Sequence, residues 1–295
     1  MAVSKVESFS LDTDAWPMRA EPAEDLLTRG FTAVAQVLAA YHRHRILHIE
    51  RLGDLLEKGR PVILVSNHAL SVIDPLLLLS EVYRRYGVMP RTLAHEAGWF
   101  RTPILRDVSA RYGVVPSRAP ESAAAALSES RFLFIFPGGA SEAALRDYRA
   151  EPYKLKWSGR TGFLRLALEH DAELVFVAAV GNDDSYYQSR LQIPKRLLRY
   201  FDSSGGDRYF GTRVPLGPAG LPLPVQITHS IAPPLDLGDR KKALSNPTEL
   251  AALHKRVWTE CQTFLDDAVD VAHQSADLTD RAMREITGFL GRLGL

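Results

Sequence analysis

The sequence predicts an α/β fold in which a mostly parallel central sheet is flanked by helices, with an N-terminal amphipathic helix and a C-terminal helical extension. Two observations support this fold class. Through the middle of the 295-residue chain, short apolar runs alternate with segments whose apolar residues recur at helical spacing. The run at residues 62–66 is apolar and β-branched nearly throughout, as expected of a buried strand. Strands that alternate with helices pair in parallel, because each crossover helix returns the chain to the same edge of the sheet.

Composition narrows the class of protein. The formal net charge is +1, so a general affinity for nucleic acid is not expected. The single cysteine, Cys261, excludes an internal disulfide framework and fits a reducing compartment. The N-terminal stretch lacks the apolar core of a signal peptide, and no window reaches the ~18 to 20 apolar residues of a spanning helix. We therefore expect a cytoplasmic protein that meets a membrane only from its surface.

Three parts of the chain are expected. Residues 1–45 hold a polar arm and an amphipathic helix, residues 46–235 form the α/β domain, and residues 236–295 form the helical extension. The basic end of the first helix, residues 42–45, has two interpretations. It complements the dipole of a helix packed on the core, or it anchors the helix on anionic lipid.

The elements follow in order from periodicity and turn signals. Strands are expected at residues 46–49, 62–66, 91–94, 113–115, 131–136, 174–180 and 225–231. Helices are expected at residues 23–41, 75–86, 121–128 and 161–170, with shorter helical segments at 52–58 and 99–111. Two amphipathic helices close the chain, the first marked by Leu250, Leu253, Val257, Cys261, Phe264, Ala268 and Val271, the second by Met283, Ile286, Leu290 and Leu293.

Residues 182–224 interrupt this rhythm. Between Tyr186 and Arg213, six basic residues face only two aspartates, with aromatic residues interspersed. A long irregular connection is usually functional or disordered. The segment is interpreted as a solvated surface loop, a lid over a site, or a contact with acidic lipid.

The stretch after the strand at 62–66 carries the strongest chemical signal. His68 follows the strand, and Asp74-Pro75 opens a helix. Ligands of open α/β sheets bind at the carboxyl ends of the strands, and a neutral histidine held by a carboxylate is a general base. Six residues on a helix correspond to ~240° of rotation, so the two side chains meet only if residues 69–73 form a turn. The alternative is a structural histidine and a helix-capping aspartate.

Two further stretches offer binding groups at strand ends. Gly138 and Gly139 follow the strand at 131–136, and backbone N–H groups of such a turn can hold an anion or a developing oxyanion, although a simple turn has the same sequence. Arg118 ends GVVPSR and could bind a phosphate or carboxylate, or lie on the surface as an ordinary arginine. The chain has no G-x-S-x-G elbow and no familiar metal-ligand spacing, so neither a protein nucleophile nor a metal is expected.

Taken in order, NHALSVID, GVVPSR, FPGGASEA and LVFVAAVG resemble the four sequence blocks of the glycerolipid, or lysophospholipid, acyltransferase superfamily. The resemblance covers about residues 46–231. This chain has one extra residue between His68 and Asp74, and Gly138 stands where many members have a glutamate. The P-G-G with a nearby glutamate, and the sequence that follows from residue 151 to 184, look most similar to the diacylglycerol acyltransferase and phytyl ester synthase branch.

The resemblance implies an O-acyltransferase of lipid metabolism, with phospholipid or other glycerolipid biosynthesis as its setting. It would move a fatty acyl group from acyl-CoA or acyl-carrier protein to a lysophospholipid, diacylglycerol or long-chain alcohol at a membrane surface, without a cofactor. His68 oriented by Asp74 would be the base, and Gly138 and Gly139 would stabilise the oxyanion. Residues implied in orienting substrate are Arg118, Glu142 and Lys154. A lipid hydrolase that uses the same pair and a non-catalytic lipid-binding protein are the alternatives.

Overall fold

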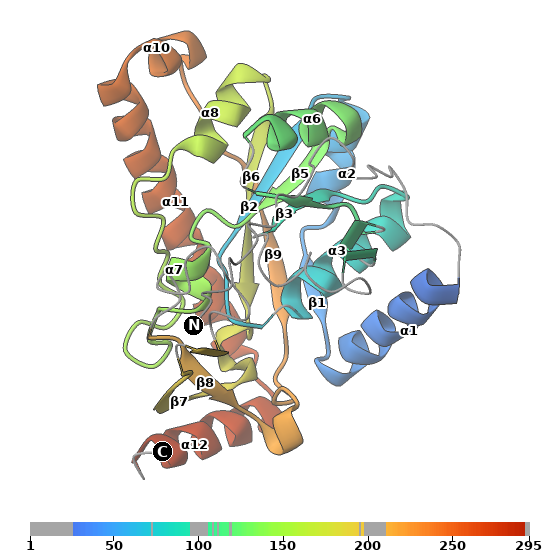
Figure 1. Ribbon diagram of the computed structural model, residues 1–295, viewed down its shortest axis with the longest axis vertical. Coiled ribbons are helices and arrows are strands. Elements are labelled where there is room, and N and C mark those ends of the chain that lie inside the picture. The colour runs from blue at the N-terminus through green and yellow to red at the C-terminus, as the bar shows by residue number, and fades with distance from the viewer. Residues whose placement is uncertain are drawn as a thin grey trace, which may run out of the picture.

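The computed structural model describes residues 26–71, 73–94, 106–107, 109–110, 112–117, 120–194, 196–197 and 211–292. These residues form an α/β fold around a seven-stranded sheet of order β1-β9-β6-β2-β5-β3-β4, which confirms the predicted fold class (Figure 1). Within the described strands, every neighbouring pair is parallel except β6 and β9. The sheet strands are β1 (Arg45–Leu47), β2 (Val62–Ser66), β3 (Arg91–Ala94), β4 (Val114–Pro116), β5 (Phe132–Ile135), β6 (Glu173–Val180) and β9 (Thr228–Pro234).

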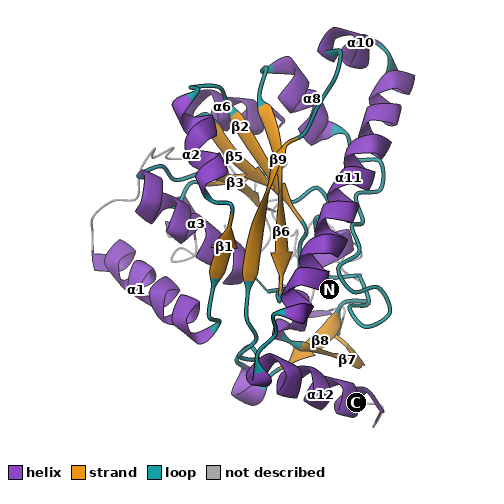
Figure 2. Cartoon of the chain, turned by 180° about the vertical axis from the view of Figure 1, so that it is seen from behind, coloured by secondary structure: helices purple, strands orange, loops and turns teal. Residues whose placement is uncertain are grey.

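Helices cover both faces of this sheet (Figure 2). Along β2 the side chains alternate between two cores, with Val62 and Leu64 in one and Ile63 and Val65 in the other, because successive residues of a strand point to opposite faces. The first core contains α2 (Glu50–Glu57) and α3 (Ile73–Tyr86). The second contains α6 (Pro120–Ser130), α8 (Gly162–Glu169), α10 (Arg240–Ser245) and α11 (Pro247–Gln274).

The long helix α11 shares the core of the α/β domain. Leu253, Val257, Cys261 and Leu265 recur at every fourth position and are buried in the cluster that contains β6. The helix starts at Pro247, after Asn246 accepts a hydrogen bond from the Thr248 N–H at its cap. α12 (Leu278–Arg292) follows and is mostly exposed. The predicted boundary at residue 236 therefore separates elements in sequence that pack together in space.

Two stretches differ from the sequence predictions. Residues 182–224 contain an antiparallel pair, β7 (Tyr187–Gln192) and β8 (Arg213–Leu216), and two short 3₁₀ turns, η2 (Asp183–Ser185) and η4 (Pro218–Gly220). The last strand continues through Pro233 and Pro234, where the prediction ended it. A register shift between β6 and β9 accommodates these prolines, which cannot donate a ladder hydrogen bond.

The basic end of α1 (Leu26–Tyr41) contacts other parts of the protein. Arg43 forms ion pairs with Asp277 and Asp280, at 3.2 and 2.7 Å, and the His42 Nδ1 lies 2.9 Å from the Val225 carbonyl oxygen. This favours the packed interpretation of residues 42–45. No helix in the described part of the chain is long and apolar enough to cross a bilayer. The predicted polar arm and residues 99–105 lie outside the described residues.

Candidate active site

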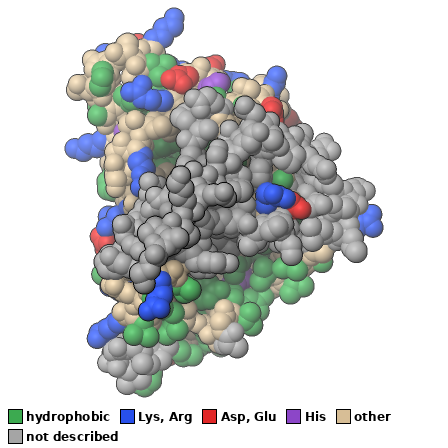
Figure 3. Space-filling model, viewed as in Figure 1, with side chains coloured by type: hydrophobic (Ala, Val, Ile, Leu, Met, Phe, Trp, Pro, Cys, Tyr) green, Lys and Arg blue, Asp and Glu red, His purple; other side chains and the backbone are tan. Residues whose placement is uncertain are grey.

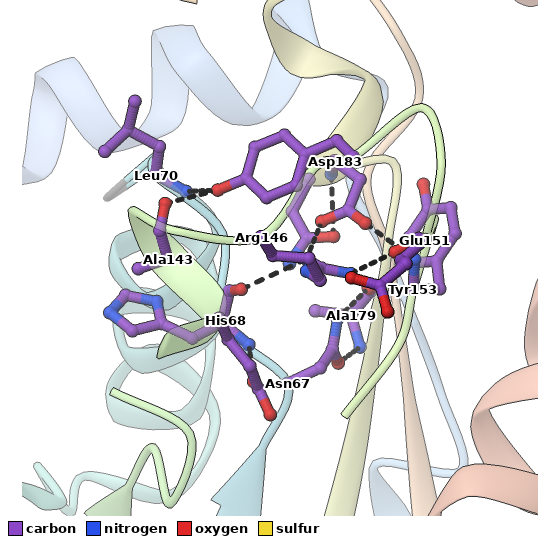
Figure 4. Close-up of polar contacts among 12 residues, drawn as sticks. Asn67, His68, Leu70, Ala143, Arg146, Glu151, Tyr153, Ala179 and Asp183 are labelled. Carbon is purple, nitrogen blue, oxygen red and sulfur yellow. Dashed lines mark hydrogen bonds and ion pairs between the residues drawn. The ribbon is translucent and has the colours of Figure 1, made fainter. Parts of the chain in front are cut away.

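His68 lies at the carboxyl end of β2, where the chain leaves the sheet. The two residues before His68 hold the backbone there through side-chain hydrogen bonds to β6. The buried Ser66 hydroxyl donates to the Val177 carbonyl at 2.7 Å. The Asn67 side-chain amide forms two hydrogen bonds with the backbone of Ala179 in β6. It donates to the Ala179 carbonyl at 2.9 Å and accepts from the Ala179 N–H at 2.8 Å (Figure 4). Because both Asn67 bonds run to the neighbouring strand, the backbone at His68 is held in register with the sheet.

The His68 imidazole is stacked against an aromatic ring and is uncharged at neutral pH. Its ring centroid lies 4.1 Å from that of Phe136, with an interplanar angle of 21°. Burial lowers the pKa of His68 to about 4, and the nearby charge of Arg146 acts in the same direction. Its Nδ1 is buried and has no hydrogen-bond partner within the described structure. At neutral pH this imidazole is unprotonated, which is the form that a general base needs.

Asp74 is the second residue of α3, and its side chain is buried. Residues 69–71 are not helical, and the helix that contains Asp74 begins at Ile73. The carboxylate accepts a long hydrogen bond of 3.5 Å from the Asn182 amide through Oδ2, whereas Oδ1 has no partner in the part of the chain that is described. Burial raises the pKa of Asp74 well above its usual range. Pairing of His68 with Asp74 stays a prediction, with one unpartnered buried atom on each side.

Glu142, in the short helix α7 (Ala140–Ala143), holds the backbone of His68. Its buried carboxylate accepts the His68 N–H at 2.9 Å and the Lys156 N–H at 2.7 Å. Burial raises the pKa of Glu142 to about 7, against the effect of these two N–H donors. Since this side chain is fully enclosed and bonded to backbone, it stabilises the loop that carries His68.

The glycine loop fits closely around that carboxylate. A Cβ on Gly138 would lie 2.0 Å from the Glu142 Cδ, so the glutamate occupies the space that any side chain at position 138 needs. Gly139 has a φ of +47°, which favours glycine, and its N–H donates to the Phe136 carbonyl at 3.1 Å. Arg160 donates to the carbonyls of Pro137 and Gly138, at 2.9 and 2.6 Å.

A buried ion pair supports His68 from the other side. The Arg146 Nη2 lies 2.5 Å from the Asp183 Oδ1, and both side chains are almost fully buried (Figure 4). Arg146 also donates to the His68 carbonyl at 3.3 Å, and Asp183 accepts the Tyr153 N–H at 2.7 Å. Sequence reasoning missed this pair. The available signal was the run Asn182-Asp183-Asp184 directly after a buried strand, at the sheet edge where His68 lies.

Of the other two predicted residues, the structure describes only Lys154. Lys154 is exposed, and its ammonium lies 5.8 Å from the centroid of the Trp258 ring on α11. Arg118 lies outside the described residues. The structure therefore gathers His68, Gly138 and Glu142 at one end of the sheet, with Asp74 at the start of the following helix, and gives Lys154 a contact elsewhere.

Comparison with known proteins identifies the class. The sequence model of the acyltransferase family matches residues 48–180, the span that holds β2, His68, Asp74, the glycine loop and Glu142. Residues 48–180 are therefore similar in sequence to the acyltransferase family of enzymes. The chloroplastic phytyl ester synthase 2 of Arabidopsis thaliana is a distant homologue, 27% identical over 154 residues. The match takes in 48% of this chain and 22% of that relative, so the chain spans far less than the relative's length.

Proposed function

We propose that the protein transfers a fatty acyl group from acyl-CoA or acyl-carrier protein to a lipid hydroxyl, with His68 as the general base. The observation that carries the proposal is the uncharged imidazole of His68, placed at the carboxyl end of β2 inside the span that matches the acyltransferase family. The reaction belongs to lipid metabolism. We also propose that it serves phospholipid biosynthesis and that the protein attaches to a membrane surface in the cytoplasm.

In the proposed mechanism, the acceptor hydroxyl gives its proton to His68 as its oxygen attacks the thioester carbonyl carbon. The C–S bond then breaks, and the leaving thiolate takes the proton from the imidazole. His68 Nδ1 is buried, which leaves Nε2 to face the hydroxyl. Nδ1 then carries hydrogen, and the unpartnered Oδ1 of Asp74 is its proposed acceptor once substrate is bound, because hydrogen bonds of catalytic groups often tighten only in the complex. No acyl-enzyme is needed.

The glycine loop is the proposed binding site for the oxyanion. The Gly139 N–H donates within the loop. The Gly138 N–H makes no hydrogen bond to any residue that the structure describes, so it is the group we assign to the oxyanion. Arg118 remains a proposed contact for a phosphate or carboxylate of the substrate, and Lys154 a proposed group for orienting it. Glu142 acts through the backbone of His68 and takes no direct part in substrate binding.

The acceptor alcohol is assigned by chemical class. The homologue is named for the synthesis of phytyl esters, which makes a long-chain alcohol the first acceptor to try. Diacylglycerol and a lysophospholipid are the others that the family resemblance implies.

The test is whether ester formation depends on an added acceptor alcohol. The purified full chain is incubated with radiolabelled palmitoyl-CoA, alone and with a long-chain alcohol, diacylglycerol or lysophosphatidic acid, and the labelled products are separated. The proposal predicts a labelled ester only when one of the alcohols is present. Release of free fatty acid at the same rate without acceptor would instead identify a hydrolase. Lipid binding without turnover of any substrate would identify a lipid-binding protein.

A further inference from the structure

The outer part of the β7–β8 hairpin exposes apolar side chains. Leu191 is 70% exposed near the outer end of β7. Leu216, which pairs with Tyr187 at the inner end of the hairpin, and Leu221, which follows the short turn η4, are also exposed. Along β7 the first three residues are buried and the last three are exposed. The hairpin therefore has an inner half of β7 that packs on the protein and an outer half of β7 that leaves Leu191 in solvent.

Helix α12 exposes an apolar stripe of its own. Leu278, Ala282, Ile286 and Phe289 are spaced by four, four and three residues, which places them on one side of the helix, and Leu278 is 82% exposed. Asp280, on another side, is buried and accepts hydrogen bonds from Arg43 and from the Gln226 N–H. The helix is thus attached through its polar side and leaves its apolar side uncovered.

These two features lie at the same end of the molecule, the end that holds His68. β7, β8 and α12 are neighbours at the lower end in both ribbon views (Figures 1 and 2). Hydrophobic side chains gather along this lower edge, with basic side chains beside them (Figure 3). β6 ends at Val180 and the chain enters β7 at Tyr187, so the carboxyl ends of β6 and its parallel neighbour β2 face this end.

The inner half of β7 connects the hairpin to the candidate active site. Gln188 accepts the Tyr148 N–H at 3.0 Å and donates to the Arg146 carbonyl at 2.9 Å. Tyr148 in turn accepts the Leu70 N–H at 2.6 Å, and Arg146 donates to the His68 carbonyl. A small cavity separates the two regions, lined by Leu70, Ser71, Tyr148, Tyr186 and Pro215 among others.

The charge of the hairpin matches an anionic surface. The described residues between 186 and 216 include Arg190, Arg196 and Arg213 and no acidic residue. Arg213 is paired with Asp147 at 2.6 Å, whereas Arg190 and Arg196 are exposed. In α1, by contrast, three of the four basic residues at its end, His42, Arg43 and His44, are bonded within the protein.

We infer that the outer half of the β7–β8 hairpin and the apolar stripe of α12 form the surface on which this protein docks to an anionic lipid bilayer. The inference rests on the proposed function, because it brings a bilayer-held acceptor to the end of the sheet where His68 lies. Leucine and phenylalanine side chains enter the interface, and the arginines contact lipid phosphates.

The test is binding of the full chain to sedimented vesicles of equal parts phosphatidylcholine and phosphatidylglycerol. Leu191→Asp and Phe289→Asp should each weaken binding at least tenfold, because each removes a large apolar contact and adds a charge of the wrong sign. Arg190→Ala should weaken it about fivefold. The matched control is Val37→Asp, which places the same charge at a side chain of α1 that is 69% exposed; it should bind like wild type.

Binding that is lost with Val37→Asp but kept with Leu191→Asp and Phe289→Asp would overturn the inference, as would equal binding to vesicles of phosphatidylcholine alone. Assembly of the chain into a dimer that these variants dissolve, measured by sedimentation, would assign the surface to a second copy instead. On a water-soluble acyl thioester and a short-chain alcohol, Leu191→Asp should keep wild-type activity. Wild-type vesicle binding without acyl transfer would reject the proposed function and leave the docking surface standing.

Discussion

Gly138 and Glu142 form one structural unit at the scale of single residues. The carboxylate of Glu142 lies against the Cα of Gly138 and accepts the backbone N–H of His68. In the sequence these are two separate observations, a glycine where the resembling family often has a glutamate and a glutamate four residues later. The structure explains them together, because the second residue fills the space beside the first.

Gly138→Ala therefore should displace the Glu142 side chain. We expect it to lower the free energy of unfolding by about 1–3 kcal/mol and to reduce acyl transfer, since the added methyl group overlaps the carboxylate. Urea unfolding and the acyl-transfer assay measure the two effects. Gly162→Ala is the matched control, because a Cβ there meets nothing within 4 Å and alanine favours a helix. Equal stability of the two variants would contradict the assigned packing.

The pH dependence of transfer reports the state of His68. The base must be unprotonated, and burial lowers the pKa of His68 to about 4, so kcat/KM should rise as pH rises through about 4 and be level through pH 6.5. The unfolded chain takes up this proton near pH 6.5, so stability falls as pH drops from 6.5 toward 4, and circular dichroism must confirm folding at each point. If kcat/KM instead fell with a midpoint near pH 6.5 as the pH is lowered, the imidazole would be solvated during catalysis.

At the scale of elements, the end of β2 depends on its side-chain bonds to β6. Asn67 uses its amide as both donor and acceptor to Ala179. Asn67→Asp keeps the shape but cannot donate, and it faces the Ala179 carbonyl with a carboxylate oxygen. We expect a loss of about 1–3 kcal/mol in the free energy of unfolding. Gln192→Glu, the same chemical change at an exposed position of β7, should stay within about 0.5 kcal/mol of wild type in the same denaturation experiment.

The sequence predicts most elements but not the hairpin. β2 and β6 are apolar runs because both of their faces are buried, so their composition alone predicts them. β7, with the sequence YQSRLQ, shows no such pattern. Its inner half is held by polar Gln188, which bonds to backbone at Tyr148 and Arg146, and its outer half is exposed. A strand stabilised in this way has no apolar periodicity to detect.

Part of the candidate site also could not be predicted from the sequence. His68, Asp74, Gly138 and Glu142 follow from local motifs, and the structure places them at the end of the sheet. The Arg146–Asp183 pair joins positions 37 residues apart, and only the fold brings them together. For Lys154 the structure gives a contact with the Trp258 ring, and its role in substrate binding stays a prediction.

At the scale of the whole molecule, α11 is part of the core and α12 is not. A chain that ends after Asn246 loses Leu253, Val257, Cys261 and Leu265 from the main core. We expect it to show no cooperative thermal transition by circular dichroism, because losing several buried side chains at about 2–5 kcal/mol each exceeds the stability of a typical domain. A chain that ends after Ser275 lacks only α12 and should unfold cooperatively. A folded chain without α11 would support an independent domain at residues 46–235.

The central claim is that His68 takes the proton of the acceptor hydroxyl. Its most direct test is the rate of ester formation from labelled palmitoyl-CoA by wild type and His68→Gln, a neutral replacement that can still pack on Phe136. We expect a fall in kcat of about 10²-fold to 10⁴-fold, with the KM for the thioester little changed and folding intact by circular dichroism. A His68→Gln enzyme that retains ester formation within a few-fold of wild type would contradict it.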